Sequence, residues 1–338
     1  MNPAILKEWL KLTDQTRRNI FTETSAAIGL PDAAVEKDWW VVHTIDLVFN
    51  TSIAPHTVFK GGTSLSKAWG LIDRFSEDID LALDRRFLGF DKKDNEMTGS
   101  QVRKLREQSF QFISENYFPE LRRKFFDAGF DNVTFHLGEI KSHDQDPLII
   151  EIYYPTVTDT VSYLQPRVLI EVGSRSMMEP FEKCSFTSFV GEHFKDRPFA
   201  DELITIPTVR PERTFLEKIF LLHEEFQQPF KKIKVERKSR HLYDLEKLMD
   251  TGFAKAALAD NGLYQIIVDH RKTITPLRGI DYSNHTPDKI NPIPPESIIG
   301  AWEKDYIAMQ ESMLYKPSLP FDKLIARLYE LKARINHL

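Results

Sequence analysis

The chain has 338 residues and a formal net charge of −5, with 41% hydrophobic and 28% charged residues, which excludes a disordered or fibrous protein and does not in itself indicate a nucleic-acid binder. No apolar run approaches the roughly 18 residues that span a bilayer; the N-terminus lacks the pattern of a secretory signal, and the single cysteine, Cys184, excludes an internal disulfide and a cysteine-rich zinc site. We therefore expect a cytoplasmic protein of about two domains with no membrane partner.

The N-terminal quarter of the chain is expected to change from helix to strand. Residues 1–50 carry apolar side chains at loosely helical spacing, and Pro31-Asp32 indicates a break between helices. Residues 56–60 are β-branched and aromatic and run directly into Gly61-Gly62, which predicts a strand, a turn and a short helix. Polar and apolar residues alternate over 78–83, as they do in a half-buried strand.

Further along, helical periodicity returns and is followed by more strands. The pattern predicts a helix over 100–128 and then strands over 132–137, 148–154 and 167–172. Pro207 and Pro211 bracket a boundary, after which helices are expected from Pro211, over 239–250 and over 320–336, with a long loop over 273–295. Segment 231–240 holds six Lys or Arg against one Glu, which is typical either of a solvated face or of a phosphate-binding strip.

These elements predict an α+β protein. We divide it into an N-terminal helical segment (1–50), a core domain with a small mixed β-sheet and flanking helices (51–207), and a mainly helical C-terminal domain (208–338).

One stretch, residues 59–83, combines features suited to phosphoryl transfer. Gly61 and Gly62 permit a tight turn and close backbone approach to a phosphate, and Thr63 and Ser64 place hydroxyls at the start of the next helix. Asp78 and Asp80 lie on one face of a strand, where two carboxylates can hold Mg²⁺ ions that also bind substrate phosphates. Each feature alone is ordinary, since Gly-Gly is usually a turn and Asp-x-Asp a surface pair or cap. Their order and spacing predict a metal-dependent nucleotide site.

Other phosphate and metal motifs are absent from the sequence. The stretch from Gly61 to Lys67 lacks the second glycine of a P-loop, and there is no Gly-x-Gly-x-x-Gly or His-Glu-x-x-His.

The strings KGGTSL (60–65) and RFSEDIDL (74–81) resemble the signature of the polymerase-β-like nucleotidyltransferase superfamily. In detail they resemble the AbiEii/AbiGii group, the toxin halves of bacterial toxin–antitoxin and phage-abortive-infection systems. RTFLEKI (213–219) and RHLYDL (240–245) are similar to the later motifs of this group, so the resemblance covers about 59–250.

The resemblance assigns roles to further residues. It implies an essential lysine at Lys218 and a functional aspartate at Asp244, which would support the nucleotide site or form an acid/base pair with Lys218. Taken alone, Lys218 is typical of a lysine whose stem packs while its ammonium reaches water, and Asp244 of a surface carboxylate. The nucleotide-binding set is expected to be Gly61, Gly62, Thr63, Ser64, Lys67, Arg74, Ser76, Lys218 and Arg240.

A third carboxylate usually completes the metal site in this superfamily. Glu171 is the first candidate and Glu151 the second, although either is also compatible with an outward polar position in a strand, and the usual residue is an aspartate. Arg74 is suited to phosphate contact or to a surface ion pair with Asp73 or Glu77.

The resemblance implies Mg²⁺ or Mn²⁺ as cofactor, an NTP as substrate, transfer of NMP to an RNA acceptor such as the 3′ end of tRNA, and a cognate antitoxin. Two alternatives stay open: transfer to a protein or small molecule, and a non-catalytic nucleotide or RNA sensor on the same fold. An interaction module with incidental carboxylates is the least favoured reading.

Overall fold

The computed structural model describes residues 3–159 and 164–337, which divide into two compact units. The first, here the sheet unit, comprises the chain up to Trp69 together with Phe75–Asp91 and Ser100–Val209. The second, here the helical unit, comprises Gly70–Arg74, Lys92–Gly99 and the chain from Arg210. The predicted boundary at 207/208 lies inside a strand, because Pro207 pairs with Lys183 in a β-ladder.

The sheet unit begins with three helices, in agreement with the helical prediction for this region: α1 (Pro3–Lys11), α2 (Asp14–Ile28) and α3 (Asp32–Val48). The hydroxyl of Thr13 caps α2 by accepting from the Thr16 N–H, and Gly29 ends the helix in the left-handed conformation. Pro31 occupies the N-cap of α3, which confirms the predicted break. Later helices of this unit are α4 (Gly61–Thr63), α5 (Gly99–Phe112), α6 (Phe118–Asp127) and α7 (Phe189–His193).

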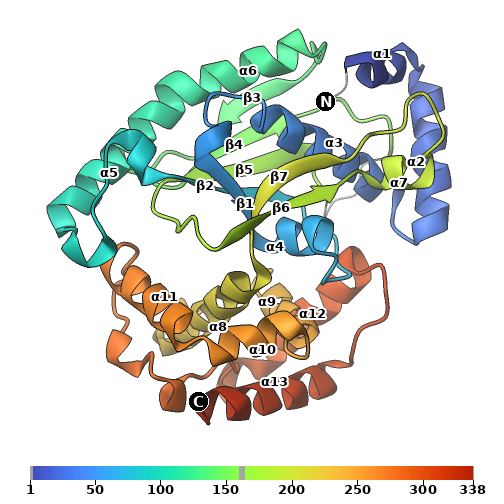
Figure 1. The fold of residues 1–338 in the computed structure, drawn as a ribbon. Helices are drawn as coiled ribbons and strands as arrows, with labels where there is room; N and C mark the ends of the chain where they lie inside the picture. Colours follow the sequence, from blue (N-terminus) through green and yellow to red (C-terminus); the bar gives the residue numbers. More distant parts are fainter. Residues whose placement is uncertain (1–2, 160–163, 338) are drawn as a thin grey trace. The chain divides into compact units, whose positions relative to one another are not determined.

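A mixed sheet forms the centre of this unit (Figure 1). In the described residues it has seven strands in the order β3-β4-β5-β2-β1-β7-β6. Strand β2 runs antiparallel to β1 and parallel to β5. The strands are β1 (Thr57–Lys60), β2 (Asp78–Leu83), β3 (Thr134–Leu137), β4 (Leu148–Tyr153), β5 (Arg167–Gly173), β6 (Phe181–Phe186) and β7 (Ile204–Val209).

The two faces of the central strands differ in burial, and this difference positions the site. Strand β2 buries Ile79 and Leu81, whereas Asp78 and Asp80 on the opposite face are only partly buried. Strand β5 alternates in the same way, with Ile170 buried and Glu171 partly buried. Helix α3 packs against β2 and β5. This period-two pattern leaves the carboxylates on one face of the sheet and the aliphatic core on the other.

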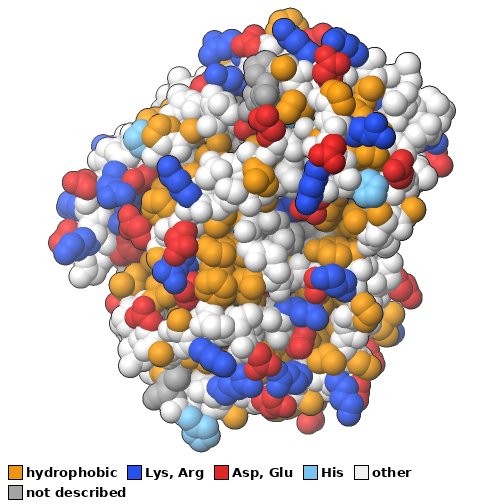
Figure 2. All heavy atoms as spheres, turned by 45° about the vertical axis from the view of Figure 1, so that its right-hand side comes forward, with side chains coloured by type: hydrophobic (Ala, Val, Ile, Leu, Met, Phe, Trp, Pro, Cys, Tyr) orange, Lys and Arg blue, Asp and Glu red, His pale blue; other side chains and the backbone are white. Residues whose placement is uncertain are grey.

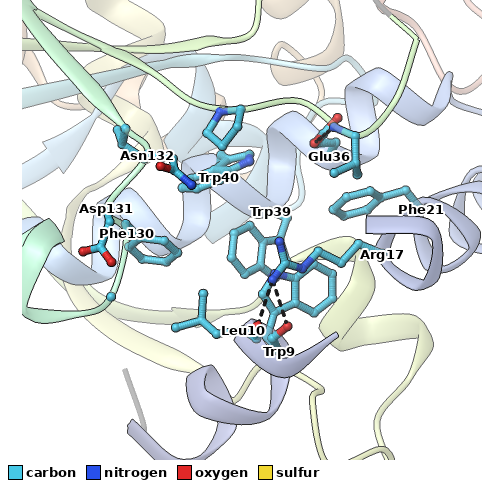
Figure 3. Close-up of a pocket in the computed structure, with 14 residues that line it drawn as sticks. Trp9, Leu10, Arg17, Phe21, Glu36, Trp39, Trp40, Phe130, Asp131 and Asn132 are labelled. Carbon is cyan, nitrogen blue, oxygen red and sulfur yellow. Dashed lines mark hydrogen bonds between the residues drawn. The ribbon is translucent and has the colours of Figure 1, made fainter. Parts of the chain in front are cut away.

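Aromatic side chains line a cavity of about 150 Å³ among the N-terminal helices of the sheet unit (Figure 3). The indole rings of Trp9 and Trp39 stack with centroids 4.6 Å apart. Arg17 reaches across to α1 and donates to the carbonyl oxygens of Trp9 and Leu10. Ring stacking therefore joins α1 to α3, and the hydrogen bonds of Arg17 join α2 to α1.

The helical unit confirms the predicted helices after Pro211, which occupies the first turn of α8. Helix α8 contacts α9, α10 and α11, and α9 contacts α12 and α13. The segment 273–295 is a loop with short 3₁₀ turns, as expected. The helices are α8 (Pro211–Gln227), α9 (Ser239–Leu248), α10 (Gly252–Ala259), α11 (Asn261–Thr273), α12 (Ile299–Met313) and α13 (Phe321–Asn336).

The fold is α+β, as the sequence predicts. Strands β6 and β7 and helices α10, α11 and α12 are not among the predicted elements. Within the described part of the chain, no helix is long and apolar enough to cross a membrane. The face shown in Figure 2 intersperses acidic and basic side chains, consistent with a net charge near neutrality.

Candidate active site

Three carboxylates share one face of the sheet. In the parallel β2–β5 ladder, Asp80 stands opposite Glu171 and Asp78 stands opposite Leu169. Residues opposite one another on neighbouring strands point to the same face, so the side chains of Asp78, Asp80 and Glu171 rise from the half-buried face together. The register thus places the predicted third carboxylate beside the Asp-x-Asp pair.

Glu151 lies on the same face, but its carboxylate already has two partners. Glu151 lies on β4, opposite Leu169 of β5, so the whole of β5 stands between Glu151 and β2. Its carboxylate accepts from Arg167 Nη1 at 3.0 Å and from the Tyr153 hydroxyl at 2.7 Å. Of the two candidates, Glu171 is therefore better placed to act with Asp80.

Gly61 and Asp80 fit together so closely that no side chain could replace the glycine hydrogen. Gly61 has a φ of +82°, and a Cβ atom built there would lie 1.9 Å from Asp80 Oδ2. Lys60, the residue before it, stands opposite Asp80 in the β1–β2 ladder. The turn thus needs glycine twice, for its left-handed backbone and for the space that the carboxylate occupies.

The hydroxyls of the turn are used to hold the two halves of the site together. Thr63 Oγ1 lies 2.5 Å from the carbonyl oxygen of Asp78 and 3.0 Å from Ser76 Oγ. Ser64 donates to the carbonyl oxygen of Gly61 at 2.8 Å. Thr63 and Ser64 are fully buried. Their placement favours a supporting role over the direct phosphate contact that the sequence predicts.

Lys67 is also turned inward. Its ammonium pairs with Asp38 Oδ1 at 2.9 Å, lies over the ring of Phe189 at 3.9 Å from the centroid, and is 6% exposed. A buried, paired ammonium is poorly placed to bind a phosphate, so we omit Lys67 from the proposed phosphate ligands.

The helical unit contains a second cluster of predicted site residues. The guanidinium of Arg74 donates from Nε and Nη2 to the two oxygens of Asp244, at 2.7 and 2.9 Å. Lys218 Nζ lies 2.8 Å from Asp244 Oδ2. Asp244 is fully buried and Arg74 is 1% exposed, so neither is a surface residue. Arg74 pairs with Asp244 and is buried, so the reading of Arg74 as a member of a surface ion pair does not hold.

Burial and charge act against each other in this cluster. Burial alone would raise the pKa of Asp244, but the charges and hydrogen bonds of Arg74 and Lys218 outweigh it and lower that pKa to about 2. Burial lowers the pKa of Lys218, opposed by Asp244 and reinforced by Arg74. Asp244 is thus an anion shared by two cations.

His241 is a member of the cluster that the sequence analysis did not single out. Its Nδ1 lies 3.4 Å from Lys218 Nζ, and burial, followed by the charge of Lys218, lowers its pKa well below the ordinary value. A neutral imidazole can accept a hydrogen bond from the lysine. The spacing in the sequence could have indicated this residue, because His241 precedes Asp244 by three positions on α9 and so shares its helix face. Arg240, next to it, adds positive charge that acts on both His241 and Lys218.

The donor chemistry of the sheet face fits a hard divalent cation. Within residues 3–159 and 164–337, no three His, Cys, Asp or Glu side chains converge closely enough to hold a metal ion. Mg²⁺, however, keeps several waters and is commonly bound by one or two carboxylates together with substrate phosphates. Asp78 and Asp80, both only partly buried on one face of β2, can supply such carboxylates.

An Asp-x-Asp strand held against a glycine turn within a mixed sheet defines the class: this is a nucleotidyltransferase fold. The model of the family described as nucleotidyl transferase AbiEii toxin, type IV TA system, matches residues 48–327, and the chain belongs to this family. It is therefore a nucleotidyltransferase toxin of a toxin–antitoxin system, and an antitoxin partner follows from that membership.

A solved structure has the same fold. The chain is similar to MenT4, a nucleotidyltransferase toxin from Mycobacterium tuberculosis H37Rv, with 17% identity and a TM-score of 0.52 over 97% of this chain and 90% of that chain. At this identity the likeness concerns the fold. No curated protein matches the chain.

Proposed function

We propose that the chain transfers a nucleoside monophosphate from an NTP to the 3′ end of a tRNA. The observation that carries the nucleotidyl-transfer part of this proposal is the fit between Gly61 and Asp80, where the carboxylate fills the space of the missing side chain. The exposed lysines of segment 231–240 support the RNA acceptor. A structural turn needs glycine for its backbone, but it does not need an acidic side chain lodged against it on a half-buried face.

The residues of the sheet face would divide the work as follows. Asp78 and Asp80 would hold Mg²⁺ or Mn²⁺ together with the substrate phosphates, and Glu171, opposite Asp80 in the ladder, would be the third carboxylate to join them. The bound metal supplies neutralisation of the charge on the attacking and leaving oxygens. The Gly61-Gly62 turn lets the triphosphate approach the backbone, and Thr63 keeps the turn against Asp78.

The reaction forms one P–O bond and breaks another. The 3′-hydroxyl oxygen of the acceptor bonds to the α-phosphorus, the bond from that phosphorus to the bridging oxygen breaks, and pyrophosphate leaves. The hydroxyl proton passes to solvent. The protein mainly positions the reactants and offsets their charge.

In the helical unit, Arg240 is the proposed phosphate-binding cation. Lys218 is omitted on the same ground as Lys67, because its side chain is 8% exposed and its ammonium is paired with Asp244. Asp244, which is fully buried and paired on both sides, would position Arg74 and Lys218 without touching substrate. Lys231, Lys232 and Lys234 are exposed, which supports the interpretation of 231–240 as an RNA-binding strip.

The test is incubation of the purified chain with each α-³²P-labelled NTP, Mg²⁺ and total tRNA. Two variants accompany it: Asp80→Asn, and Glu182→Gln as a matched control on an exposed carboxylate of β6. We expect label in tRNA with the wild type and Glu182→Gln, and its loss by at least about 100-fold with Asp80→Asn.

The remaining outcomes decide between acceptors. Label that appears in protein and not in RNA would move the proposal to a protein acceptor. NTP binding without label in any macromolecule or small molecule would contradict the transferase proposal for these acceptors and favour a nucleotide sensor.

A further inference from the structure

Helix α3 buries three consecutive charged residues, which is unusual for a helix that packs in a hydrophobic core. Glu36, Lys37 and Asp38 are 2%, 3% and 2% exposed. Charged side chains are seldom fully buried unless they are paired, because removing a charge from water costs several kcal/mol. Consecutive helical residues point about 100° apart, so the three side chains reach three different segments of the sheet unit.

Lys37 holds the strands that carry the carboxylates. Its ammonium pairs with Glu77, the residue directly before Asp78, and donates to the carbonyl oxygen of Gln165 at 3.0 Å. Gln165 leads into β5, the strand of Glu171. One ammonium therefore fixes the beginnings of both parallel strands, next to their paired residues.

Asp38 holds the other half of the site. Its carboxylate accepts from Lys67 at 2.9 and 3.1 Å and from the backbone N–H of Phe189 at 2.7 Å. Lys67 lies in the π-helical segment Ser64–Ala68 that follows the Gly61-Gly62 turn. Adjacent residues of one helix thus hold the segment that follows the glycine turn and the beginning of the Asp-x-Asp strand.

We propose that Lys37 and Asp38 are positioning residues of the nucleotidyl transfer, which set the distance between the Gly61 turn and the carboxylates of Asp78 and Asp80. This inference rests on the proposed function for its catalytic consequence. The two gripped segments already touch one another through Thr63 and Asp78, and Asp80 fits against Gly61 with no space to spare. A small shift of either segment would therefore alter the site.

Glu36 provides an internal control on the same helix. It is as buried as its neighbours and accepts from the N–H groups of Val157 and Thr158 and from the hydroxyls of Thr156 and Thr158. It also lines the aromatic cavity of Figure 3, whose wall includes none of the proposed site residues. Its loss should cost stability without moving the glycine turn or β2.

The kinetic test measures kcat and KM for three variants: Lys37→Met/Glu77→Gln, Asp38→Asn and Glu36→Gln. All are compared with the wild type at one temperature at which circular dichroism shows every variant folded. The first variant removes both charges of the buried pair together, so that neither remains in the core without the other. We expect kcat to fall about 10- to 100-fold in the first two variants, with KM for NTP changed less than about threefold. Glu36→Gln should keep the wild-type kcat although it lowers the melting temperature. Lys37→Arg, which retains the charge, replaces the double variant if that variant does not fold, and it should recover most of the wild-type kcat.

A second readout does not depend on turnover. Hydrogen–deuterium exchange should become faster over 60–68 and 76–81 in the Lys37 and Asp38 variants, and over 154–158 in Glu36→Gln. Inactivity of the wild type with this exchange pattern would reject the proposed acceptors and keep the positioning role. Wild-type kcat in the folded Lys37 and Asp38 variants, or equal losses of kcat in all three, would overturn the inference.

Discussion

Arg74 and Asp244, 170 positions apart along the chain, form a buried two-hydrogen-bond ion pair in the helical unit. The string RFSEDIDL is therefore divided: Arg74 belongs to the helical unit, and the residues from Phe75 onward belong to the sheet unit. What reads as one motif in the sequence carries two separate tasks.

Replacing Arg74 with lysine should weaken the helical unit, because a single ammonium cannot reproduce the planar, two-pronged contact with Asp244. We expect the free energy of unfolding to fall by about 1–3 kcal/mol, measured by urea denaturation. Arg86→Lys is the matched control, since Arg86 pairs with Asp84 at a side-chain exposure of 58%. Equal losses in the two variants would show that the buried geometry of Arg74 carries no special weight.

Gly61→Ala should abolish transfer. The new Cβ atom would meet Asp80 Oδ2 at 1.9 Å, so the carboxylate must move, and we expect at least about a 100-fold loss of kcat. Gly89→Ala controls for backbone strain, because Gly89 also has a φ of +82° but has no atom within 4 Å of its Cβ position. If both variants lose activity alike, strain and not the displaced carboxylate explains the effect.

The metal requirement should distinguish Glu171 from Glu151. Glu171→Gln should raise the Mg²⁺ concentration that gives half-maximal transfer by about tenfold or more, because it stands beside Asp80 in the ladder. Glu151→Gln should leave that concentration unchanged, since Arg167 and Tyr153 already engage its carboxylate. The reverse result would assign the third carboxylate to β4.

His223 should make the chain sensitive to mild acid. Burial, followed by the neighbouring His285, lowers the pKa of His223 from 6.5 to about 4, and its Nδ1 accepts from the Asn291 N–H at 3.1 Å. A folded-state pKa below the unfolded value means that the unfolded chain binds the proton more tightly. The contribution of the neutral ring to stability is thus complete above pH 6.5 and is lost as the pH falls towards 4, by about 3 kcal/mol in all. Urea denaturation from pH 7 to 4.5 should show a smaller loss of unfolding free energy in His223→Gln than in the wild type, and parallel curves would refute this.

Asp305 should hold the basic segment 231–240, the proposed RNA-binding strip, in one conformation. Arg237 has a φ of +58°, and its N–H donates to Asp305 Oδ1 at 2.6 Å while Ser239 donates to Oδ2. Asp305→Ala should weaken tRNA binding by about 1 kcal/mol, or roughly fivefold in Kd, because the segment must then be ordered on binding.

The charge change in this variant works in the opposite direction, since removing an acid would favour RNA. Glu303→Ala makes the same change at an exposed position of α12 and should bind tRNA as tightly as the wild type or more tightly. Filter binding at fixed salt measures both variants, and tighter binding by Asp305→Ala would count against the ordering role.

The elements with strong local patterns could be predicted, and those defined by distant partners could not. Asp78–Leu83 alternates polar and apolar residues, and Pro211 opens a helix, so both were predicted. Strand β6 was missed because most of its side chains are exposed at the sheet edge, which leaves no alternation to detect. Strand β7 contains Pro207, which reads as a boundary, yet the strand continues to Val209.

The same limit holds in the site. The two-residue spacing of Asp78 and Asp80 shows from the sequence that they share one face of a strand. The position of Glu171 beside them depends on the β2–β5 register, which no local pattern fixes. The phosphate-binding role predicted for Lys67 ignores its partner, Asp38. That partner could not be foreseen, because it lies 29 positions upstream on another helix. Asp244 resembles a surface carboxylate until Arg74 and Lys218 are placed around it.

The interleaving of the two units along the chain has a consequence for dissecting this toxin. The polypeptide changes unit at five junctions, so a single cut cannot release either one whole. A fragment beginning at Arg210 would contain Asp244 and Lys218 without Arg74, and the complementary fragment would contain Arg74 without its carboxylate. Split-protein reporters, and chimaeras made by one crossover with a related gene, would therefore combine mismatched pieces. Exchange of the helical unit requires that the short stretches Gly70–Arg74 and Lys92–Gly99 be transplanted with it.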